Sequence, residues 1–217
     1  AINEKLDSKI IEELIFPGAL LENGSYNRIP LHLAIENCCD IDVIELLDSE
    51  EARNEISKLC GTPLHLAVEC CCDKDVIKLF VTDLNLVTRN KENEIPLHLA
   101  ITYYPEMHIM ELLISKDALL MKNKNGDTPL LMLLHYSVDP EAVDSFISAG
   151  VLSIKDNTGK TPIHLAAYLD KELEIVKKLK TDSCLTEQDE IGNTPLHASL
   201  ESCCNLNVIK YLVSEKC

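Results

Sequence analysis

The nine residues Gly61–Glu69 read GTPLHLAVE, and this pattern returns along the chain. The related segments are RIPLHLAIE, EIPLHLAIT, DTPLLMLLH, KTPIHLAAY and NTPLHASLE. From Pro30 to Pro63 the interval is 33 residues, and the same interval leads in turn to Pro96, Pro129, Pro162 and Pro195. A register kept through five successive intervals predicts a repeat architecture, because each unit of such a fold is one supersecondary motif of fixed length.

Each repeat opens with the sequence pattern of a helix start. Threonine stands directly before the proline at Thr62, Thr128, Thr161 and Thr194. A hydroxyl at the N-cap followed by proline at the first helical position is typical of a helix N-terminus. Ile29 and Ile95 replace this threonine in the first and third repeats, which removes a cap worth about 1 kcal/mol. We therefore expect those two helix starts to be weaker.

A second helix is predicted ten residues after each proline, where a capping residue precedes paired apolar residues. The capping residues are Asp40, Asp73, Glu106, Asp139, Glu172 and Asn205. Side chains of this kind accept hydrogen bonds at a helix N-terminus or complement its positive end. The apolar pairs that follow, such as Val43 and Ile44, predict one buried stripe for each second helix. Polar segments such as KNKNGD and KDNTGK predict the connecting turns.

A 33-residue unit of a turn and two helices that opens with Thr-Pro-Leu-His resembles the ankyrin repeat. The resemblance covers residues 24–217 with six helix pairs, and residues 1–23 are expected to be a partial N-terminal repeat. It implies one all-α domain over residues 1–217, an ankyrin-repeat solenoid of stacked antiparallel helix pairs joined by turn and hairpin loops. The start in mid-repeat indicates an excised segment or an abbreviated N-terminal cap. Ankyrin repeats usually have Gly-His between the helices, whereas this chain has Cys38-Cys39 and Cys71-Cys72.

The charge of the chain limits its partners. Its 36 acidic and 20 basic residues give a formal charge of -16, which disfavours nucleic acid and anionic membrane surfaces. No apolar run reaches the length of about 18 residues that predicts a membrane span, and the first residues lack a signal-peptide pattern. We therefore expect no nucleic-acid partner and no membrane insertion. The expected location is cytoplasmic or otherwise intracellular and reducing, or a host cytosol if the chain is a secreted effector.

Histidines recur two residues after five of the prolines, at His32, His65, His98, His164 and His197. Helices of neighbouring repeats lie about 8 to 10 Å apart, too far for two such histidines to share one zinc ion through bonds of about 2 Å. The ankyrin resemblance implies instead that this histidine holds its turn together by hydrogen bonds. We therefore predict a structural role for these side chains and no metal site.

The ten cysteines are interpreted from the same spacing. Equivalent cysteines such as Cys38 and Cys71 are expected about one repeat apart, beyond the reach of about 7 Å for a disulfide, and no C-x2-C pair suggests zinc. We interpret most of them as small, partly buried thiols. Reactivity is left open for Cys70 and Cys217, although Glu69 and Asp73 argue against a lowered pKa of the Cys70 thiol.

The resemblance implies that protein partners bind to the turn tips and to the exposed side of each first helix, on the concave face of the solenoid. Carried over by position, the candidate binding residues are Tyr26, Arg28, Asn37, Glu69, Cys70, Thr102, Tyr103, His135, Tyr136, Tyr168 and Leu169. Tyrosine is favoured at interface hot spots, and the alternative is that these tyrosines merely cover the first helices. The acidic charge predicts a partner with a basic or apolar face.

No glycine-rich phosphate loop and no nucleophile elbow occurs in the sequence, so we expect no catalytic residues and no cofactor. The predicted function is a non-catalytic protein-protein interaction module. The alternative is a targeting or substrate-recruitment region of a larger enzyme or bacterial effector, with the catalytic part outside these residues. A self-assembling structural protein is a third class, and the oligomeric state is left open.

Overall fold

The computed structural model describes residues 19–103, 106–136, 140–147, 150–181, 183–202 and 205–214. The chain divides into two compact units, Ala1–Leu113 and Ile114–Cys217. Within the described residues the regular elements are helices, and pairing of the strand type is limited to one isolated bridge between Ser57 and Gly61. The predicted partial repeat at residues 1–23 lies largely outside the described residues, and the single domain over residues 1–217 stays a prediction.

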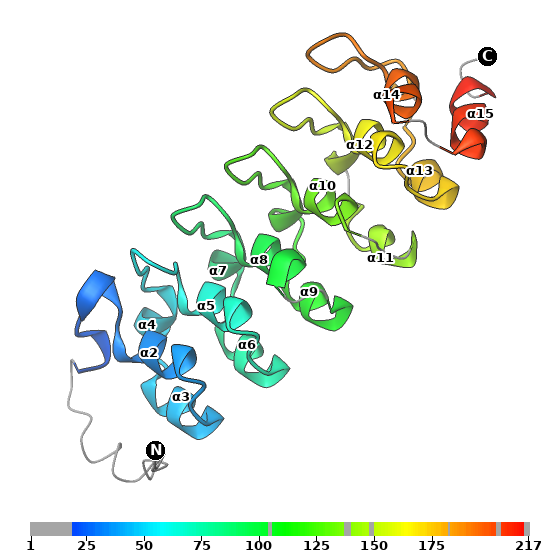
Figure 1. The fold of residues 1–217 in the computed structure, drawn as a ribbon. Helices are drawn as coiled ribbons and strands as arrows, with labels where there is room; N and C mark the ends of the chain where they lie inside the picture. The colour runs from blue at the N-terminus through cyan, green and yellow to red at the C-terminus, as the bar shows by residue number, and fades with distance from the viewer. Residues whose placement is uncertain are drawn as a thin grey trace. The chain divides into compact units, whose positions relative to one another are not determined.

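The first unit contains three helix pairs, whose members Figure 1 shows in two rows. The first helix of each pair is α2 (Pro30–Glu36), α5 (Pro63–Glu69) or α8 (Pro96–Tyr103). The second helix is α3 (Ile41–Leu47), α6 (Lys74–Phe80) or α9 (Met107–Leu113). Helix α5 packs against α2 and α8 as well as against its own partner α6. The first unit is therefore a stack of antiparallel helix pairs.

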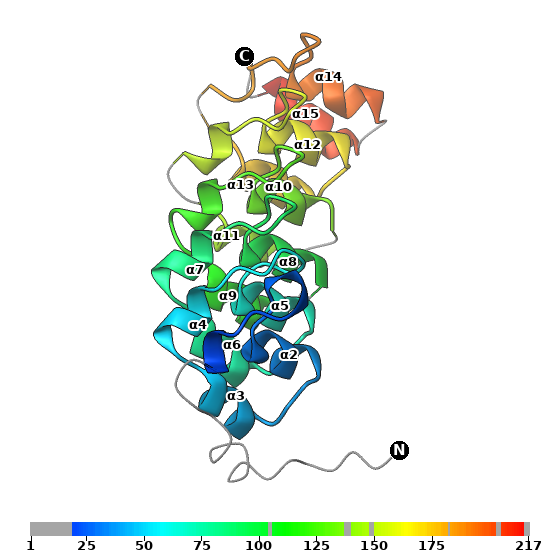
Figure 2. The ribbon, with the colours of Figure 1, turned by 90° about the vertical axis from the view of Figure 1, so that its left-hand side faces the viewer.

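The second unit repeats this arrangement (Figure 2). Its first helices are α10 (Pro129–Leu134), α12 (Pro162–Tyr168) and α14 (Pro195–Glu201). Its second helices are α11 (Pro140–Asp144), α13 (Leu173–Lys178) and α15 (Leu206–Ser214). Helix α12 packs against both α10 and α14, and α13 packs against α11 and α15. The same local sequence pattern thus gives the same local packing in both units.

All six predicted first helices begin at the motif proline. In α5 the start is a reciprocal capping box, because the Thr62 side chain accepts the backbone N–H of His65 and the ring of His65 accepts the backbone N–H of Thr62. Thr161 and Thr194 form the same box at the starts of α12 and α14. The N-cap role predicted for these threonines is confirmed.

The second helices also begin at the predicted place. Asp73 and Glu172 stand at the N-cap of α6 and α13, but neither side chain makes a capping hydrogen bond. Asn205 does cap its helix, since its Oδ1 accepts the backbone N–H of Asn207 at 2.8 Å. The carboxylates of Asp73 and Glu172 are therefore left to act through their charge at the positive helix end. The predicted cap Asp139 lies outside the described residues.

The core of the first unit comes from fixed positions of each repeat. Leu64, Ala67 and Val68 of α5 are fully buried, one, four and five residues after the proline. This spacing places them on one face of the helix, because helical side chains three and four residues apart are neighbours. Ile77 and Phe80 of α6 are fully buried as well. Burial of such side chains contributes about 1.5 to 3 kcal/mol each.

A short helical element that the sequence analysis did not predict follows four of the second helices. These elements are α4 (Glu50–Asn54), α7 (Asp83–Val87), η3 (Ala118–Leu120) and η4 (Val151–Ser153). Ser49 caps the first of them by accepting the N–H of Ala52 at 3.0 Å, and Thr82 caps the second by accepting the N–H of Asn85 at 3.1 Å. Ser49, Thr82 and Ser115 follow one another at intervals of 33 residues. This recurring hydroxyl is the sequence signal that could have predicted the short elements.

A hairpin-like loop precedes each first helix from α5 to α14, and we call these five loops fingers. In each finger the first residue donates its backbone N–H to the carbonyl of the last, over residues 57–61, 90–94, 123–127, 156–160 and 189–193. In Figure 1 the fingers of the first unit extend away from α3, α6 and α9. The predicted all-α fold of stacked antiparallel helix pairs joined by turn and hairpin loops is confirmed within each unit.

Candidate functional site

The fingers are held in shape by one polar side chain each. Asn90 Oδ1 accepts the backbone N–H groups of Glu92 and Glu94, each at 2.9 Å. Asn123, Asp156 and Asp189 make the same pair of bonds in the later fingers. Such side-chain turns replace the backbone bonds that a tight loop lacks. Asparagine or aspartate every 33 residues is a second signal that the sequence analysis did not use.

A buried histidine ties each of three first helices to the finger that follows it. The Nε2 atom of His32 lies 3.1 Å from the carbonyl oxygen of Gly61, that of His65 lies 3.1 Å from the oxygen of Glu94, and that of His164 lies 3.1 Å from the oxygen of Asn193. The predicted structural role of these histidines is confirmed. The role is wider than predicted, because the bond from Nε2 joins each histidine to the finger of the next repeat.

Burial keeps these histidines neutral. It lowers the pKa of His65 to about 4, although the backbone carbonyl of Glu94 acts in the opposite direction. Burial also lowers the pKa of His32 and of His164, again against the effect of a backbone carbonyl. A neutral ring can accept the Thr62 N–H at Nδ1 while it donates from Nε2, whereas a charged ring has no acceptor. The contact at the helix start, where Nδ1 accepts, therefore depends on the neutral form, whereas the Nε2 donation to the finger does not.

His32 differs from His65 at its second nitrogen. In the Pro63 repeat, the Thr62 hydroxyl lies 2.8 Å from His65 Nδ1. Ile29 occupies the threonine place in the Pro30 repeat, and His32 Nδ1 is buried without a hydrogen-bond partner. In the third repeat the backbone N–H of Ile95 donates to His98 Nδ1 at 3.2 Å. In the first repeat neither a threonine hydroxyl nor such a backbone N–H reaches His32 Nδ1, so one buried polar atom is left unsatisfied.

The predicted binding residues of the first unit lie at the ends of the first helices and in the loop ahead of α2. Asn37 and Cys70 are the C-caps of α2 and α5, while Glu69 and Tyr103 are the last residues of α5 and α8. Glu69 and Tyr103 are exposed, whereas Cys70 is half-buried. The remaining predicted residue of these helices is Thr102, exposed, with its hydroxyl donating to the carbonyl of His98.

Two further predicted residues lie ahead of α2. Tyr26 is the most exposed tyrosine of the described residues and takes a left-handed backbone with φ of 63°. Arg28 is half-buried and forms an ion pair of 2.6 Å with Glu36, the last residue of α2. Arg28 therefore neutralises a carboxylate of its own chain, which reduces its value as a contact for a partner.

In the second unit the predicted residues occupy equivalent ends. His135 is the C-cap of α10 with Tyr136 next to it, and Tyr168 is the last residue of α12 with Leu169 as its C-cap. His135, Tyr136 and Tyr168 are exposed. The Lys160 ammonium, at the end of a finger, lies 4.8 Å from the centre of the Tyr168 ring. This cation-π contact joins a finger to the helix end beside it.

A hollow of about 450 Å³ lies where the helix ends of the first unit meet a finger. Its lining comes from the ends of α2, α5 and α8, from the loop before α5 and from finger 90–94. The residues are Glu36, Leu59, Cys60, Leu66, Glu69, Cys70, Asn90, Lys91, Glu92, Glu94, Leu99 and Tyr103. Three predicted binding residues, Glu69, Cys70 and Tyr103, are thus brought together. Most of the other lining residues were missed because they belong to segments that are far apart within the repeat.

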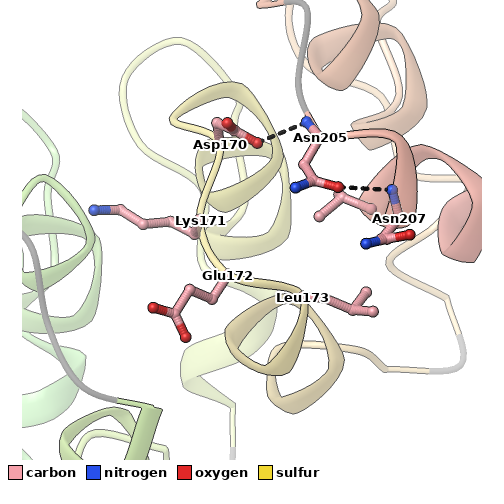
Figure 3. Close-up of a pocket in the computed structure, with 7 residues that line it drawn as sticks. Asp170, Lys171, Glu172, Leu173, Asn205 and Asn207 are labelled. Atoms are coloured by element: carbon pink, nitrogen blue, oxygen red, sulfur yellow. Dashed lines mark hydrogen bonds between the residues drawn. The ribbon is translucent and has the colours of Figure 1, made fainter.

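A smaller hollow of about 250 Å³ in the second unit lies at the starts of α13 and α15. Figure 3 shows the Asp170 carboxylate accepting the backbone N–H of Asn205 at 2.8 Å, next to the cap formed by the Asn205 side chain. Lys171 projects away from Asn205 in this view, and its ammonium donates to the carbonyl of Tyr136. These polar groups bond to the protein itself, so we assign this hollow no ligand.

The described cysteines are all free thiols, namely Cys38, Cys39, Cys60, Cys70, Cys71, Cys72 and Cys184. Burial raises the pKa of Cys70 to about 11, with smaller contributions from Cys38 and from the carboxylates of Glu69 and Glu36. Cys70 is therefore a poor nucleophile near neutral pH, in the direction predicted from Glu69. Cys217, the other cysteine left open, lies outside the described residues. Among the described residues no cluster of three or more His, Cys, Asp or Glu side chains has the arrangement of a metal site.

Residues 131–217 match the family of ankyrin repeats (3 copies). The match supports the predicted resemblance over this segment, and the six full repeats with a partial N-terminal one stay a prediction. Ankyrin repeats generally act as protein-protein interaction modules, and the family is typically non-catalytic. No curated protein matches the sequence. Within the described residues, no helix combines the length and the apolar character that crossing a membrane requires.

Proposed function

We propose that the chain is a non-catalytic interaction module that binds a protein through the ends of its first helices and the adjoining fingers, the predicted concave face. The observation that carries the proposal is the exposure of Tyr103, Tyr136 and Tyr168 at three equivalent helix ends, at 50%, 41% and 42%. Large aromatic side chains held on a fixed backbone lose little conformational entropy on binding and are enriched at hot spots. The hydrogen-bonded fingers supply that fixed backbone.

Charge indicates the kind of partner. The chain carries a formal charge of -16, and Glu69 is one of the exposed carboxylates next to the predicted contact residues. A partner with a basic or apolar face gains from this field during encounter and avoids like-charge repulsion. The seven free thiols of the described residues agree with a reducing, intracellular location, or a host cytosol for a secreted effector. We propose that residues 1–217 act as one domain, alone or as the recruiting region of a larger enzyme or effector.

The test is affinity capture from cell lysate with the full chain. The chain that carries Tyr103→Ala and Tyr136→Ala is the test variant. The control carries Leu84→Ala and Leu206→Ala, which remove exposed apolar side chains of α7 and α15. We expect a captured protein that the test variant loses by about tenfold or more and the control retains, because hot-spot residues contribute about 2 kcal/mol each. Equal capture by both variants, with both folded, contradicts the proposed surface.

A further inference from the structure

The hollow at the ends of α5 and α8 has apolar walls. Leu66 and Leu99 each stand three residues after a motif proline and are almost fully covered, so they form the base of the hollow. Leu59 and Tyr103 are about half exposed and form part of its rim. An apolar base with an exposed aromatic ring suits the flat or aliphatic part of a side chain from a partner.

The polar part of the lining is acidic. The lining includes four glutamates, Glu36, Glu69, Glu92 and Glu94, and one lysine, Lys91. Arg28 pairs with Glu36 from outside the lining, at 2.6 Å. The four glutamates come from two helix ends and from the finger, so they belong to different segments of the chain. A positive group placed inside is attracted to this acidic lining, and the apolar walls strengthen that attraction.

The finger wall is held rigidly. Asn90 donates its backbone N–H to the carbonyl of Glu94 at 2.8 Å, and its side chain fixes the N–H groups of Glu92 and Glu94. His65 holds the same carbonyl of Glu94 from α5. A hollow whose walls are fixed before binding loses less entropy when a ligand enters it.

We propose that this hollow binds an arginine side chain followed by an apolar residue in an extended segment of the partner protein. This assignment rests on the proposed function and adds to it the chemistry of the partner segment. The guanidinium is flat, stacks on aromatic rings and carries five N–H donors, so it can lie on Tyr103 and bond to carboxylates from different elements. A lysine ammonium is compact and strongly hydrated, which fits an apolar base less well. The apolar residue after the arginine covers Leu59.

The direct test is an NMR titration of the 15N-labelled full chain with the blocked pentapeptide Gly-Ser-Arg-Leu-Gly. We expect amide shifts centred on Cys70, Lys91 and Tyr103 that saturate with a dissociation constant in the range of about 1 to 10 mM, as for a single side-chain contact. The same peptide with citrulline in place of arginine should bind at least about threefold more weakly, since citrulline keeps the flat shape but loses the charge and part of the N–H donors. The lysine peptide should also bind more weakly than the arginine peptide.

Two variants of equal charge make the test specific. Glu69→Gln removes a carboxylate of the hollow, whereas Glu111→Gln removes an exposed carboxylate of α9 outside it. We expect Glu69→Gln to weaken binding of the arginine peptide about two- to fivefold and Glu111→Gln to leave it unchanged. An unchanged backbone spectrum of both variants shows that each is folded.

Three results overturn the proposal: no shifts at the hollow, equal binding of the arginine and citrulline peptides, or equal weakening by Glu69→Gln and Glu111→Gln. The last result indicates general attraction to an acidic chain. The peptide titration and the affinity capture can fail independently, so the arginine site and the proposed function are tested separately. If a captured partner depends on Tyr103 and Tyr136 but the peptide causes no amide shifts at the hollow, only the arginine site is rejected. Peptide binding at the hollow without any captured protein rejects the proposed function and keeps the site.

Discussion

The repeats that begin at Pro30 and Pro63 share a histidine and differ in how its ring is satisfied. His65 uses both ring nitrogens, Nδ1 toward Thr62 at its own helix start and Nε2 toward the finger of the next repeat. His32 keeps the finger contact at 3.1 Å, but its Nδ1 is buried without a partner beside Ile29. The comparison separates two roles of one residue. One nitrogen links repeats, and the other secures the start of the helix.

The largest expected difference between the two repeats comes from replacing each histidine by leucine, the residue that stands at this place as Leu131. His65→Leu removes the bonds of the ring to Thr62 and to the carbonyl of Glu94, so we expect a loss of about 3 kcal/mol in the free energy of unfolding. His32→Leu loses only the bond to the carbonyl of Gly61 and removes the unsatisfied Nδ1 atom, so we expect a loss of about 1 kcal/mol in the free energy of unfolding. Urea denaturation followed by circular dichroism measures both. Equal losses contradict the separation of roles.

The second effect is a dependence of stability on pH. The pKa of His65 is about 4 in the folded chain and about 6.5 when unfolded, so the unfolded chain takes up protons first as the pH falls. The contribution of the neutral ring is complete above pH 6.5 and is lost as the pH falls from about 6.5 to 4. We expect His65 alone to lower the free energy of unfolding by about 2 kcal/mol between pH 7 and pH 5. His32 and His164 act in the same direction.

The measurement compares urea midpoints at pH 7 and pH 5 in the wild type and in His65→Leu. The variant should lose a smaller part of its stability between these pH values, because it lacks one of the buried rings. If wild type and variant show the same difference, His65 is not the group whose protonation destabilises the fold.

A third effect concerns the helix starts. Thr62→Val removes the hydroxyl of the capping box at nearly constant volume, and we expect it to cost about 1 to 2 kcal/mol. The converse change is Ile29→Thr, with Ile29→Val as the matched control that removes the same carbon. We expect Ile29→Thr to be more stable than Ile29→Val by about 1 kcal/mol, because the hydroxyl provides a partner for His32 Nδ1. The reverse order in thermal unfolding rejects the missing hydroxyl as the cause of the unsatisfied atom.

The smallest effect concerns a feature that both repeats share. Cys38 and Cys71 take left-handed backbones, with φ of 50° and 54°, at the place where ankyrin repeats usually have glycine. Glycine adopts this conformation without a steric cost of about 1 kcal/mol, so we expect Cys38→Gly to stabilise the chain by up to that amount. Cys71→Gly should gain less, because the Cys71 thiol lies 3.4 Å from the carbonyl of Tyr103 and donates to it.

Cys39→Gly is the control for this effect, since Cys39 does not have a positive φ. It should lower the midpoint of thermal unfolding, as glycine outside left-handed positions only adds freedom to the unfolded chain. A gain in stability from Cys39→Gly equal to that from Cys38→Gly contradicts the conformational explanation.

Local signals made most of the fold predictable from the sequence. Thr-Pro at Thr62 and Pro63 specifies a helix start within two residues, and the exact period carries that assignment to the other repeats. The added helical elements after the second helices were missed because their caps, such as Ser49, lie in polar segments that resemble turns. The hollow was predicted only in part, through Glu69, Cys70 and Tyr103. Its other walls are brought together by stacking, which no spacing within one repeat reveals.

The central claim is that a protein partner binds at the ends of the first helices and at the fingers. Hydrogen exchange of the full chain with and without the captured partner tests it most directly. We predict slower exchange in the presence of the partner at the ends of α5, α8, α10 and α12 and in the fingers beside them, with little change in α3, α6, α9 and α13. Slower exchange confined to the second helices, with the first-helix ends and the fingers unchanged, contradicts the claim.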